Sequence, residues 1–362
     1  MANLKNPVLY GYNFDEVTED ISLQWHLTVD CDQRCKHCYM FDSDTYRTQK
    51  TNQLSTEDAF KLVDEFYKLV KGYGTLGHIA LTGGDPILSP NFWEILEYIN
   101  KYKSNIDIRI LGNPFHIDDE IAQRLKQNNV VGYQISLDGL KDAHDKMRKP
   151  GSFEDSLRAL KCLHDAKIMT DVMFTVTRSN YTQLLELIKF INTIDYVDFI
   201  TFDRMVPIGN GAMDELVDTM DYKKLLYEVH KYMVLKKPSV YIAKKDNLWK
   251  LLLYELGLTD PIDMNFKKIC NGCSAGVNTL TVLADGTVYS CRRLDIAAGK
   301  FPEEGFLEIY FNSELYKNLK KVEDLEGCKD CELLWYCRGC PAIKYAVNGS
   351  ISSKDSNCWK FI

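Results

Sequence analysis

Three cysteines near the amino terminus have the type and spacing needed to hold a metal cluster. Cys31, Cys35 and Cys38 lie in the segment CDQRCKHCY, directly after a strand-like run. Three thiolates on one loop can bind three irons of a four-iron cluster, so the fourth iron has no protein ligand. We expect that iron to accept an amino and carboxylate chelate from a small molecule. The alternative is a closed zinc site, with His26 or His37 as the fourth ligand.

Eight further cysteines lie in the last quarter of the chain, and their number suits two complete metal sites. Eight thiolates would ligate two clusters fully, which leaves no iron open to a small molecule. Two zinc sites are the alternative, because paired C-x-x-C segments are common zinc ligands. The eight are Cys270, Cys273, Cys291, Cys328, Cys331, Cys337, Cys340 and Cys358.

Composition limits the partners that the protein can have. The chain has 362 residues, 45% of them hydrophobic, and a formal net charge of -7. That charge offers no basic face to nucleic acid, and no apolar run reaches the roughly 20 residues of a membrane span. The first 20 residues lack the pattern of a signal peptide, so we expect a cytoplasmic protein without disulfides.

Cys162 sits in a segment with helical periodicity and is interpreted as a buried core thiol. The remaining histidines suggest no ligand set and are interpreted as structural.

Alternating strand and helix patterns must position the first cysteine loop. Strands are predicted at 21–29, 78–82, 107–111, 132–137, 170–177 and 199–204, and helices from Ser55 or Thr56 to Val70 and around 92–102, 118–127, 153–166 and 182–191. Six strands alternating with helices predict a parallel α/β sheet, either open or a partial barrel. The first cysteine loop follows the first strand, and the ends of such strands are where parallel barrels carry their chemistry.

The rest of the chain is predicted to differ from this alternating part. The alternation is expected to stop after Gly209, and residues 214–265 read as a helical bridge. From about residue 266 the chain is rich in cysteine and loops, with a hairpin at Thr279 to Ser290 that turns at Asp285-Gly286. We expect metal, more than a core, to hold this segment together.

The cysteine spacing C-x-x-x-C-x-x-C, with His37 before the last cysteine, resembles the signature of the radical SAM superfamily. The resemblance implies a partial (β/α)6 barrel at 21–213, after an extension at 1–20, and a [4Fe-4S] cluster that binds S-adenosylmethionine (SAM). Three later segments, each at the end of a predicted strand, match the family's other elements. Alone, a Gly-Gly-Asp-Pro stretch is more often a turn and a Ser-Leu-Asp-Gly stretch a strand end. Their order along one αβ array supports the resemblance.

These segments supply the predicted SAM contacts. Gly83, Gly84, Asp85 and Pro86 resemble the element that holds the methionine amino group, with Asp85 in place of the usual glutamate. Asn113 belongs to the second matching element. Ser136 belongs to the third and is expected to meet the methionine carboxylate. Arg158 is a further candidate for that carboxylate, and Arg148 competes with it.

The carboxy-terminal cysteines resemble the SPASM extension of radical SAM enzymes, with Gly286 five residues before Cys291. The resemblance implies a SPASM domain at 266–362 with two auxiliary [4Fe-4S] clusters, three clusters in all. The family's crossed connectivity assigns Cys270, Cys273, Cys291 and Cys340 to the nearer cluster. It assigns Cys328, Cys331, Cys337 and Cys358 to the farther one.

The resemblance implies an oxidative peptide maturase. A 5'-deoxyadenosyl radical would abstract hydrogen from a ribosomal precursor peptide, and the auxiliary clusters would accept an electron as a thioether or C–C crosslink forms. An expected partner is a reductant such as flavodoxin or ferredoxin. Only about 20 residues precede the first strand, so leader recognition would be absent, delegated to a separate leader-binding protein, or handled by the SPASM surface. The alternatives are formylglycine formation, as by sulfatase maturases, maturation of a small cofactor, and a zinc-binding scaffold.

Three side chains are candidates, by position only, for a catalytic role at the substrate. They are Asp203, Arg204 and Arg292. Sulfatase maturases place an aspartate after the cysteine equivalent to Cys291, where this chain has Arg292. That difference weakens the formylglycine alternative and hints at an anionic group in the substrate. Otherwise the arginines at 292 and 293 would pair with surface acids.

Overall fold

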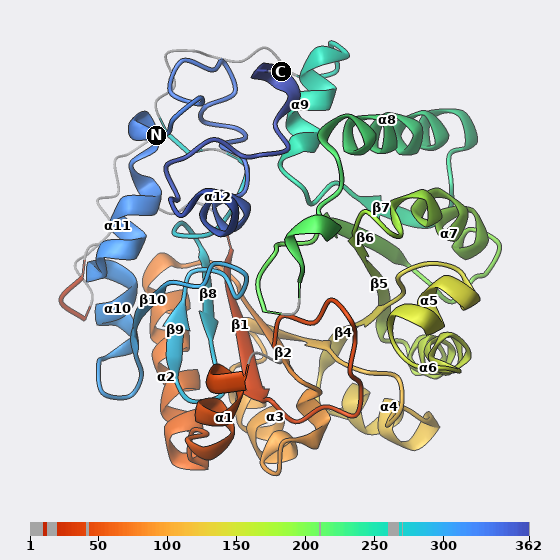
Figure 1. Cartoon of the computed structure of the whole chain (residues 1–362). Coiled ribbons are helices and arrows are strands. Elements are labelled where there is room, and N and C mark those ends of the chain that lie inside the picture. Colours follow the sequence, from red (N-terminus) through yellow and green to blue (C-terminus); the bar gives the residue numbers. More distant parts are fainter. Residues whose placement is uncertain are drawn as a thin grey trace, which may run out of the picture.

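The computed structural model describes residues 10–12, 20–40, 43–209, 211–259, 268–269 and 271–361. In this part of the chain the strands form a ten-stranded sheet with the order β10-β9-β8-β1-β2-β3-β4-β5-β6-β7. The sheet curls into a partial barrel, and helices cover its outer face (Figure 1). Six parallel strands were predicted and are present: β1 (Ile21–Thr28), β2 (Gly77–Gly83), β3 (Ile106–Leu111), β4 (Val130–Ser136), β5 (Met169–Val176) and β6 (Phe199–Arg204).

Alternate side chains of a strand face the hydrophobic core and the barrel interior. On β1 the side chains of Ile21, Leu23 and Trp25 are buried in the hydrophobic core. The intervening Ser22 and Gln24 line an internal cavity. Successive side chains of a strand point to opposite faces, so the same strands that build the core also present polar groups to the barrel interior.

The predicted helices flank these strands. Ser55 caps α2, where its hydroxyl accepts a hydrogen bond from the backbone N–H of Asp58 at 3.1 Å. Leu62 and Phe66, one turn apart on α2, are fully buried against the sheet. The outer helices are α2 (Thr56–Tyr73), α3 (Phe92–Ile99), α4 (Asp119–Gln127), α6 (Ser152–Asp165) and α7 (Leu184–Ile191).

The prediction that the alternation stops after Gly209 was wrong. Two helices, α8 (Thr219–Lys236) and α9 (Leu248–Glu255), do occupy this region. Between them, β7 (Tyr241–Ala243) pairs in parallel with β6 and extends the sheet by a seventh strand. Three residues are too few for a strand period to be read from sequence. Two further helices, α1 (Ser43–Thr51) and α5 (Lys141–Met147), were also not predicted.

The carboxy-terminal segment is integrated with the barrel. The predicted hairpin is present as β8 (Thr279–Val282) and β9 (Thr287–Tyr289), and β10 (Ala297–Lys300) continues it. However, β8 also pairs in parallel with β1, so the hairpin belongs to the main sheet. The segment also contains α10 (Phe306–Asn312), α11 (Glu314–Lys320) and α12 (Pro341–Asn348).

The expectation that metal more than a core holds this segment therefore needs correction. Phe306 and Tyr310 of α10 and Tyr316 of α11 are buried in the same hydrophobic cluster as the barrel strands. Each aromatic ring removes a large apolar area from water. The spacing of apolar residues did not reveal this, because α10 packs against α2, which is far away in the sequence.

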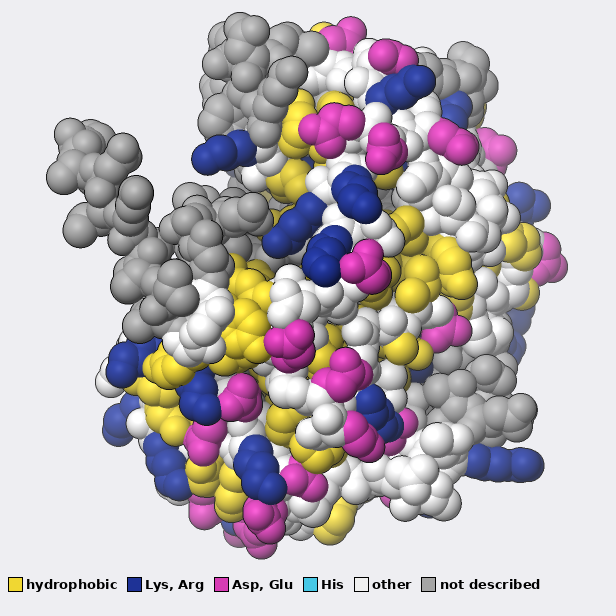
Figure 2. Space-filling model, turned by 90° about the vertical axis from the view of Figure 1, so that its left-hand side faces the viewer, with side chains coloured by type: hydrophobic (Ala, Val, Ile, Leu, Met, Phe, Trp, Pro, Cys, Tyr) yellow, Lys and Arg dark blue, Asp and Glu magenta, His cyan; other side chains and the backbone are white. Residues whose placement is uncertain are grey.

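One face of the molecule carries charges of both signs. On the face that carries α10 and α11, Lys and Arg side chains are interspersed with Asp and Glu side chains (Figure 2). Interspersed charges produce no extended field of one sign. Among the helices that the structure describes, none combines the length and the apolarity that crossing a bilayer requires.

Candidate functional site

A cavity of about 710 Å³ occupies the barrel interior and its mouth. Its walls come from the carboxyl ends of the parallel strands and from the carboxy-terminal segment. Cys31, Cys35 and Cys38 line it together with Cys273, Cys291 and Cys340, which lie at the other end of the sequence. The fold thus brings both cysteine groups to one internal space.

The first cysteine loop follows β1, and N–H groups point at its sulfur atoms. Cys31 Sγ accepts from the side chain of Asn113 at 3.2 Å and from the backbone N–H of Gln33 at 3.4 Å. Cys35 Sγ accepts from the guanidinium of Arg148 at 3.4 Å. Burial raises the pKa of the Cys38 thiol to about 11. Donors around the sulfurs suit thiolates, and metal coordination is what deprotonates a buried thiol.

Arg148, and not Arg158, reaches this loop. Arg148 is bonded through Nε to Asp138 Oδ2 at 2.6 Å and also faces Gln33, so its guanidinium is held at the cavity wall. Arg158 instead donates to the carbonyl of Ile117 at 2.6 Å and lines a separate pocket on the outside of the barrel. The sequence left both arginines open because both follow the same strand, and only the path of the chain separates them.

The glycine-rich element contributes backbone to the cavity. Gly83 and Gly84 line it, and a Cβ on Gly84 would lie 2.2 Å from the carbonyl oxygen of Asp30. Glycine is therefore needed for this close approach of two loops. Asp85 and Pro86 do not line the cavity, because the chain turns there into a short 3₁₀ helix.

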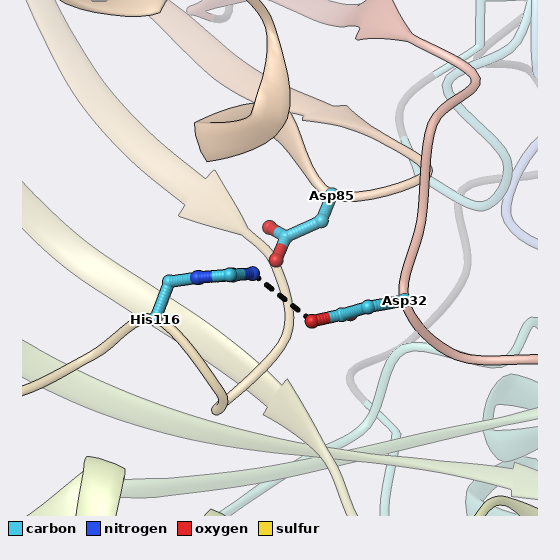
Figure 3. Close-up of side chains that lie close together, drawn as sticks. All are labelled: Asp32, Asp85 and His116. Carbon is cyan, nitrogen blue, oxygen red and sulfur yellow. Dashed lines mark ion pairs between the residues drawn. The ribbon is translucent and has the colours of Figure 1, made fainter.

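Asp85 does not line the cavity, and its carboxylate lies close to Asp32 and His116 (Figure 3). The Nε2 atom of His116 lies 3.0 Å from Asp32 Oδ2. Asp85 is fully buried, and one of its oxygens accepts from the backbone N–H of Asn113 at 3.4 Å while Oδ2 has no partner in the described structure. Burial, and then the charge of Asp32, raises the pKa of Asp85 to about 7. This carboxyl group therefore bonds the loop of Asn113 and lies close to Asp32 and His116, without a hydrogen bond to either in the described structure.

The other predicted SAM contacts lie at the cavity wall. Asn113 bonds both Cys31 and Asp32, at 3.2 and 2.9 Å. Ser136 and His37 also line the cavity. Burial lowers the pKa of His37, whose Nε2 atom lies 3.7 Å from Asp138. His37 is thus a neutral ring at the cysteine loop, able to pack against a ligand.

The three catalytic candidates differ in their surroundings. Asp203 accepts from Arg293 at 2.6 Å. Arg204 is 1% exposed and bonds Asp246 at 2.7 and 3.2 Å and Asp355 at 2.8 and 3.0 Å. Such a paired, buried arginine connects β6 to the carboxy-terminal segment and has no donor left for a substrate. Arg292 is also buried at the cavity wall but has no such acidic partner in the described structure.

The described carboxy-terminal cysteines fall into two neighbourhoods. Cys273, Cys291 and Cys340 share the cavity wall, and Cys270 lies outside the described residues. The other neighbourhood contains Cys328, Cys331, Cys337 and Cys358. There, burial, together with the nearby charges of Asp355 and Cys358, raises the pKa of Cys337 to about 12. Burial and the nearby Cys331 also raise the pKa of Cys328.

Sequence reasoning missed several residues of the site. Gln33 and Tyr39 lie within or beside the first motif and line the cavity, but neither is a motif residue. Asp138 was quoted only as part of a matching segment, and its pairing with Arg148 gives it a positioning role. No sequence signal marked Asp246 or Asp355, because each is defined by a partner far along the chain.

Comparison with family models divides the chain as follows. Residues 25–191 match the Radical SAM superfamily. Residues 273–332 match SPASM, an iron-sulfur cluster-binding domain.

Full-length relatives include enzymes of two kinds. The chain is 26% identical to an AdoMet-dependent heme synthase of Methanosarcina barkeri, over 93% of this chain and 95% of that protein. It is 29% identical to the mycofactocin maturase MftC of Mycolicibacterium smegmatis, over 93% of this chain and 82% of that protein. The crystal structure of Streptococcus suis SuiB bound to S-adenosylmethionine superposes with a TM-score of 0.72 at 16% identity, covering 95% and 76% of the two chains. The last likeness concerns the fold.

Proposed function

This chain belongs to the radical SAM superfamily and carries a SPASM iron-sulfur domain, and on that premise we propose that it oxidises a ribosomal precursor peptide to form a thioether or C–C crosslink. When a cluster and SAM are bound, reductive cleavage of SAM supplies a 5'-deoxyadenosyl radical that takes hydrogen from the substrate. The protein itself must hold the cofactors, orient the peptide and exclude water.

The first cysteine loop supports the cofactor part of this proposal. Cys31, Cys35 and Cys38 would hold three irons, and the donors from Asn113 and Arg148 are placed to stabilise their sulfurs. The backbone at Gly83 and Gly84 would receive the methionine amino group. Ser136 and Arg148, which both line the cavity, would bind the methionine carboxylate. Asp85 would act indirectly, by holding the loops around Asn113 in place.

The spacing of the sulfur atoms favours clusters over zinc. In the described part of the chain, no three cysteine sulfurs lie within 4.8 Å of one another. Thiolates on one zinc ion, with bonds of about 2.3 Å, would lie closer than that. A four-iron cluster holds its cysteines on separate irons and so spaces them more widely. We assign Cys273, Cys291 and Cys340, with Cys270, to the nearer auxiliary cluster and the remaining four cysteines to the farther one.

The observation that carries the oxidative assignment is the shared cavity. The cysteines of the radical-forming site and those of the nearer auxiliary site line the same space. A substrate there would lie between the group that takes its hydrogen and the group able to accept its remaining electron. A flavodoxin or ferredoxin would reduce the first cluster in the cytoplasm, and a separate protein would present the peptide.

A second candidate function is maturation of a small carboxylated cofactor. The similarity to AdoMet-dependent heme synthase over 93% of this chain favours it. The similarity to mycofactocin maturase favours the peptide substrate. Both candidates need the same radical and the same auxiliary electron acceptor, so they differ only in the substrate.

Anaerobic purification and turnover test the proposal. The protein should contain about twelve irons and form 5'-deoxyadenosine from SAM with a strong reductant. Incubation with a peptide encoded beside the gene should lower the peptide mass by about two hydrogens. Zinc in place of iron, or no 5'-deoxyadenosine, would refute the radical assignment. An unchanged peptide, together with turnover of a carboxylated tetrapyrrole, would favour the second candidate.

A further inference from the structure

Among the residues that the structure describes, one buried arginine at the cavity wall has no acidic partner. Arg292 is 5% exposed, and its Nε atom has no hydrogen-bond partner in the described part of the chain. No ion pair to its guanidinium is present there either. The adjacent Arg293 differs, because it bonds Asp203 at 2.6 Å and the carbonyl of Arg204 at 3.2 Å. A buried charge without a partner is costly, so a ligand that pairs with Arg292 would be strongly favoured.

Aromatic stacking does not satisfy this guanidinium. Its central carbon lies 4.9 Å from the ring centre of Tyr39 and 6.0 Å from that of Tyr289. Such contacts use the flat face of the guanidinium. The N–H groups point outward in its plane, so they stay available to an acceptor. The two rings contact the arginine without neutralising its charge.

A second buried donor lies two residues before Arg292 in the chain and lines the same cavity. Ser290 is fully buried, lines the cavity, and its hydroxyl has no partner in the described structure. His26 lies nearby and adds no positive charge, since burial and then Arg292 lower its pKa well below the usual value. Arg292 and Ser290 therefore offer one fixed cation and one neutral hydroxyl.

The chain places these donors between the two cysteine groups. Tyr39 follows Cys38 directly, and Ser290 and Arg292 flank Cys291. Arg292 contacts the ring of Tyr39. A group bound by Arg292 would therefore lie between the first cysteine loop and the nearer auxiliary site.

We propose that Arg292 and Ser290 form a subsite that binds a carboxylate of the substrate. The planar fork of an arginine matches the two oxygens of a carboxylate. The subsite deepens the proposed function, on which it rests for the identity of the cavity as the substrate site. A peptide carboxyl terminus, an acidic side chain and a small organic acid all offer this chemistry.

Binding of benzoate, compared with the neutral benzamide, tests the subsite. The anaerobically reconstituted holoenzyme is titrated calorimetrically without reductant, so no radical chemistry is involved. Wild type should bind benzoate saturably and not benzamide. Arg292→Gln should weaken benzoate binding by about 10-fold or more, and Arg292→Lys, which keeps the charge but loses the fork, by less. Iron content and unliganded melting temperature establish that each variant is folded.

Lys245→Gln is the matched control. Lys245 is an exposed cation that lines the same cavity, so this change also removes one positive charge. It should leave benzoate affinity within about threefold of wild type. The proposal is overturned if cluster-loaded wild type does not bind benzoate, if Arg292→Gln binds it normally, or if Lys245→Gln weakens binding equally. Failure of the proposed function would instead appear as missing 5'-deoxyadenosine in a separate turnover assay.

Peptide probes identify the source of the carboxylate. Acetyl-Gly-Tyr, its amide and acetyl-Glu-Tyr-amide are titrated in the same way. Tight binding of the first supports a peptide carboxyl terminus, and tight binding of the third supports an acidic side chain. If benzoate binds at least as well as both peptides, a small acid is supported. The neutral amide serves as the blank, and its binding as tightly as acetyl-Gly-Tyr would contradict carboxylate recognition.

Discussion

The amino-terminal cysteine loop and the carboxy-terminal cysteine groups meet in one cavity but are organised differently. Cys31, Cys35 and Cys38 come from eight consecutive residues, and side chains of other loops hold their sulfurs. The described carboxy-terminal cysteines extend from 273 to 358, and buried ion pairs and aromatic side chains hold their segment on the barrel. The first group is thus a local motif completed by its surroundings. The second depends on tertiary packing.

The largest effect is expected from removing the local motif. Replacing Cys31, Cys35 and Cys38 with alanine should reduce 5'-deoxyadenosine formation to background, because no site remains for the SAM-binding cluster. Iron content should fall from about twelve to about eight per chain. Liquid chromatography of SAM reactions and an iron assay measure both. Retained SAM cleavage would break the comparison, since it would place radical formation elsewhere.

Removing one carboxy-terminal cysteine should reduce the iron content but leave SAM cleavage intact. Cys358→Ala is expected to lose about four irons while 5'-deoxyadenosine formation persists, because the farther site is not the SAM site. Product formation with the true substrate should decline more than SAM cleavage does. If iron loss and loss of SAM cleavage always occur together in this variant, the two groups are not independent.

Breaking the buried ion pairs should show how much tertiary packing, as distinct from metal binding, stabilises the carboxy-terminal segment. Arg204→Met leaves Asp246 and Asp355 buried without their cation, which should lower the free energy of unfolding by about 3–5 kcal/mol. Adding Asp246→Asn and Asp355→Asn should recover part of this loss, because no unpaired charge then remains. Anaerobic urea unfolding of wild type and of the two variants measures the free energies of unfolding. Equal stability of wild type and Arg204→Met would show that metal alone holds the segment.

The two arginine candidates offer a sharper test of the first site. Arg148→Gln should raise the KM for SAM by about 10- to 100-fold, since a charge-assisted bond to a carboxylate is lost. Arg158→Gln, outside the cavity, should change it by less than about twofold. KM is measured from initial rates of 5'-deoxyadenosine formation at equal iron content. A larger effect at Arg158 would reverse the assignment.

The smallest effect concerns the pH dependence of the loop behind Arg148. Burial and then Arg148 lower the pKa of His144 to about 4, and its Nδ1 atom accepts from the backbone N–H of Asp138 at 3.1 Å. The unfolded chain binds a proton near pH 6.5 that the folded chain excludes until about pH 4. Stability is therefore complete above pH 6.5 and declines below it, by about 2 kcal/mol between pH 7 and pH 5.

His144→Gln checks this sign. The variant should be less stable than wild type at pH 7, because it loses the buried hydrogen bonds. It should also lack the decline in stability below pH 6.5. Urea unfolding at pH 5 and pH 7 measures both proteins, and an unchanged slope in the variant would assign the pH dependence to another group.

The sequence by itself determined the local parts of this protein. The six parallel strands and their helices follow from hydrophobic periods within single segments, and the first cysteine motif follows from spacing within one loop. The hairpin at β8 and β9 follows from its Asp-Gly turn. These features depend on interactions between residues close in sequence, which a single segment contains in full.

Only the tertiary structure decided the rest. It brought Cys291 and Cys340 to the cavity of Cys31, placed Arg148 but not Arg158 at the wall of that cavity, and paired β8 with β1. It also paired Arg293 with Asp203, and within the described part of the chain it gave Arg292 no acidic partner. Whether a charge has a partner depends on groups that arrive from distant segments, and no local pattern carries that information.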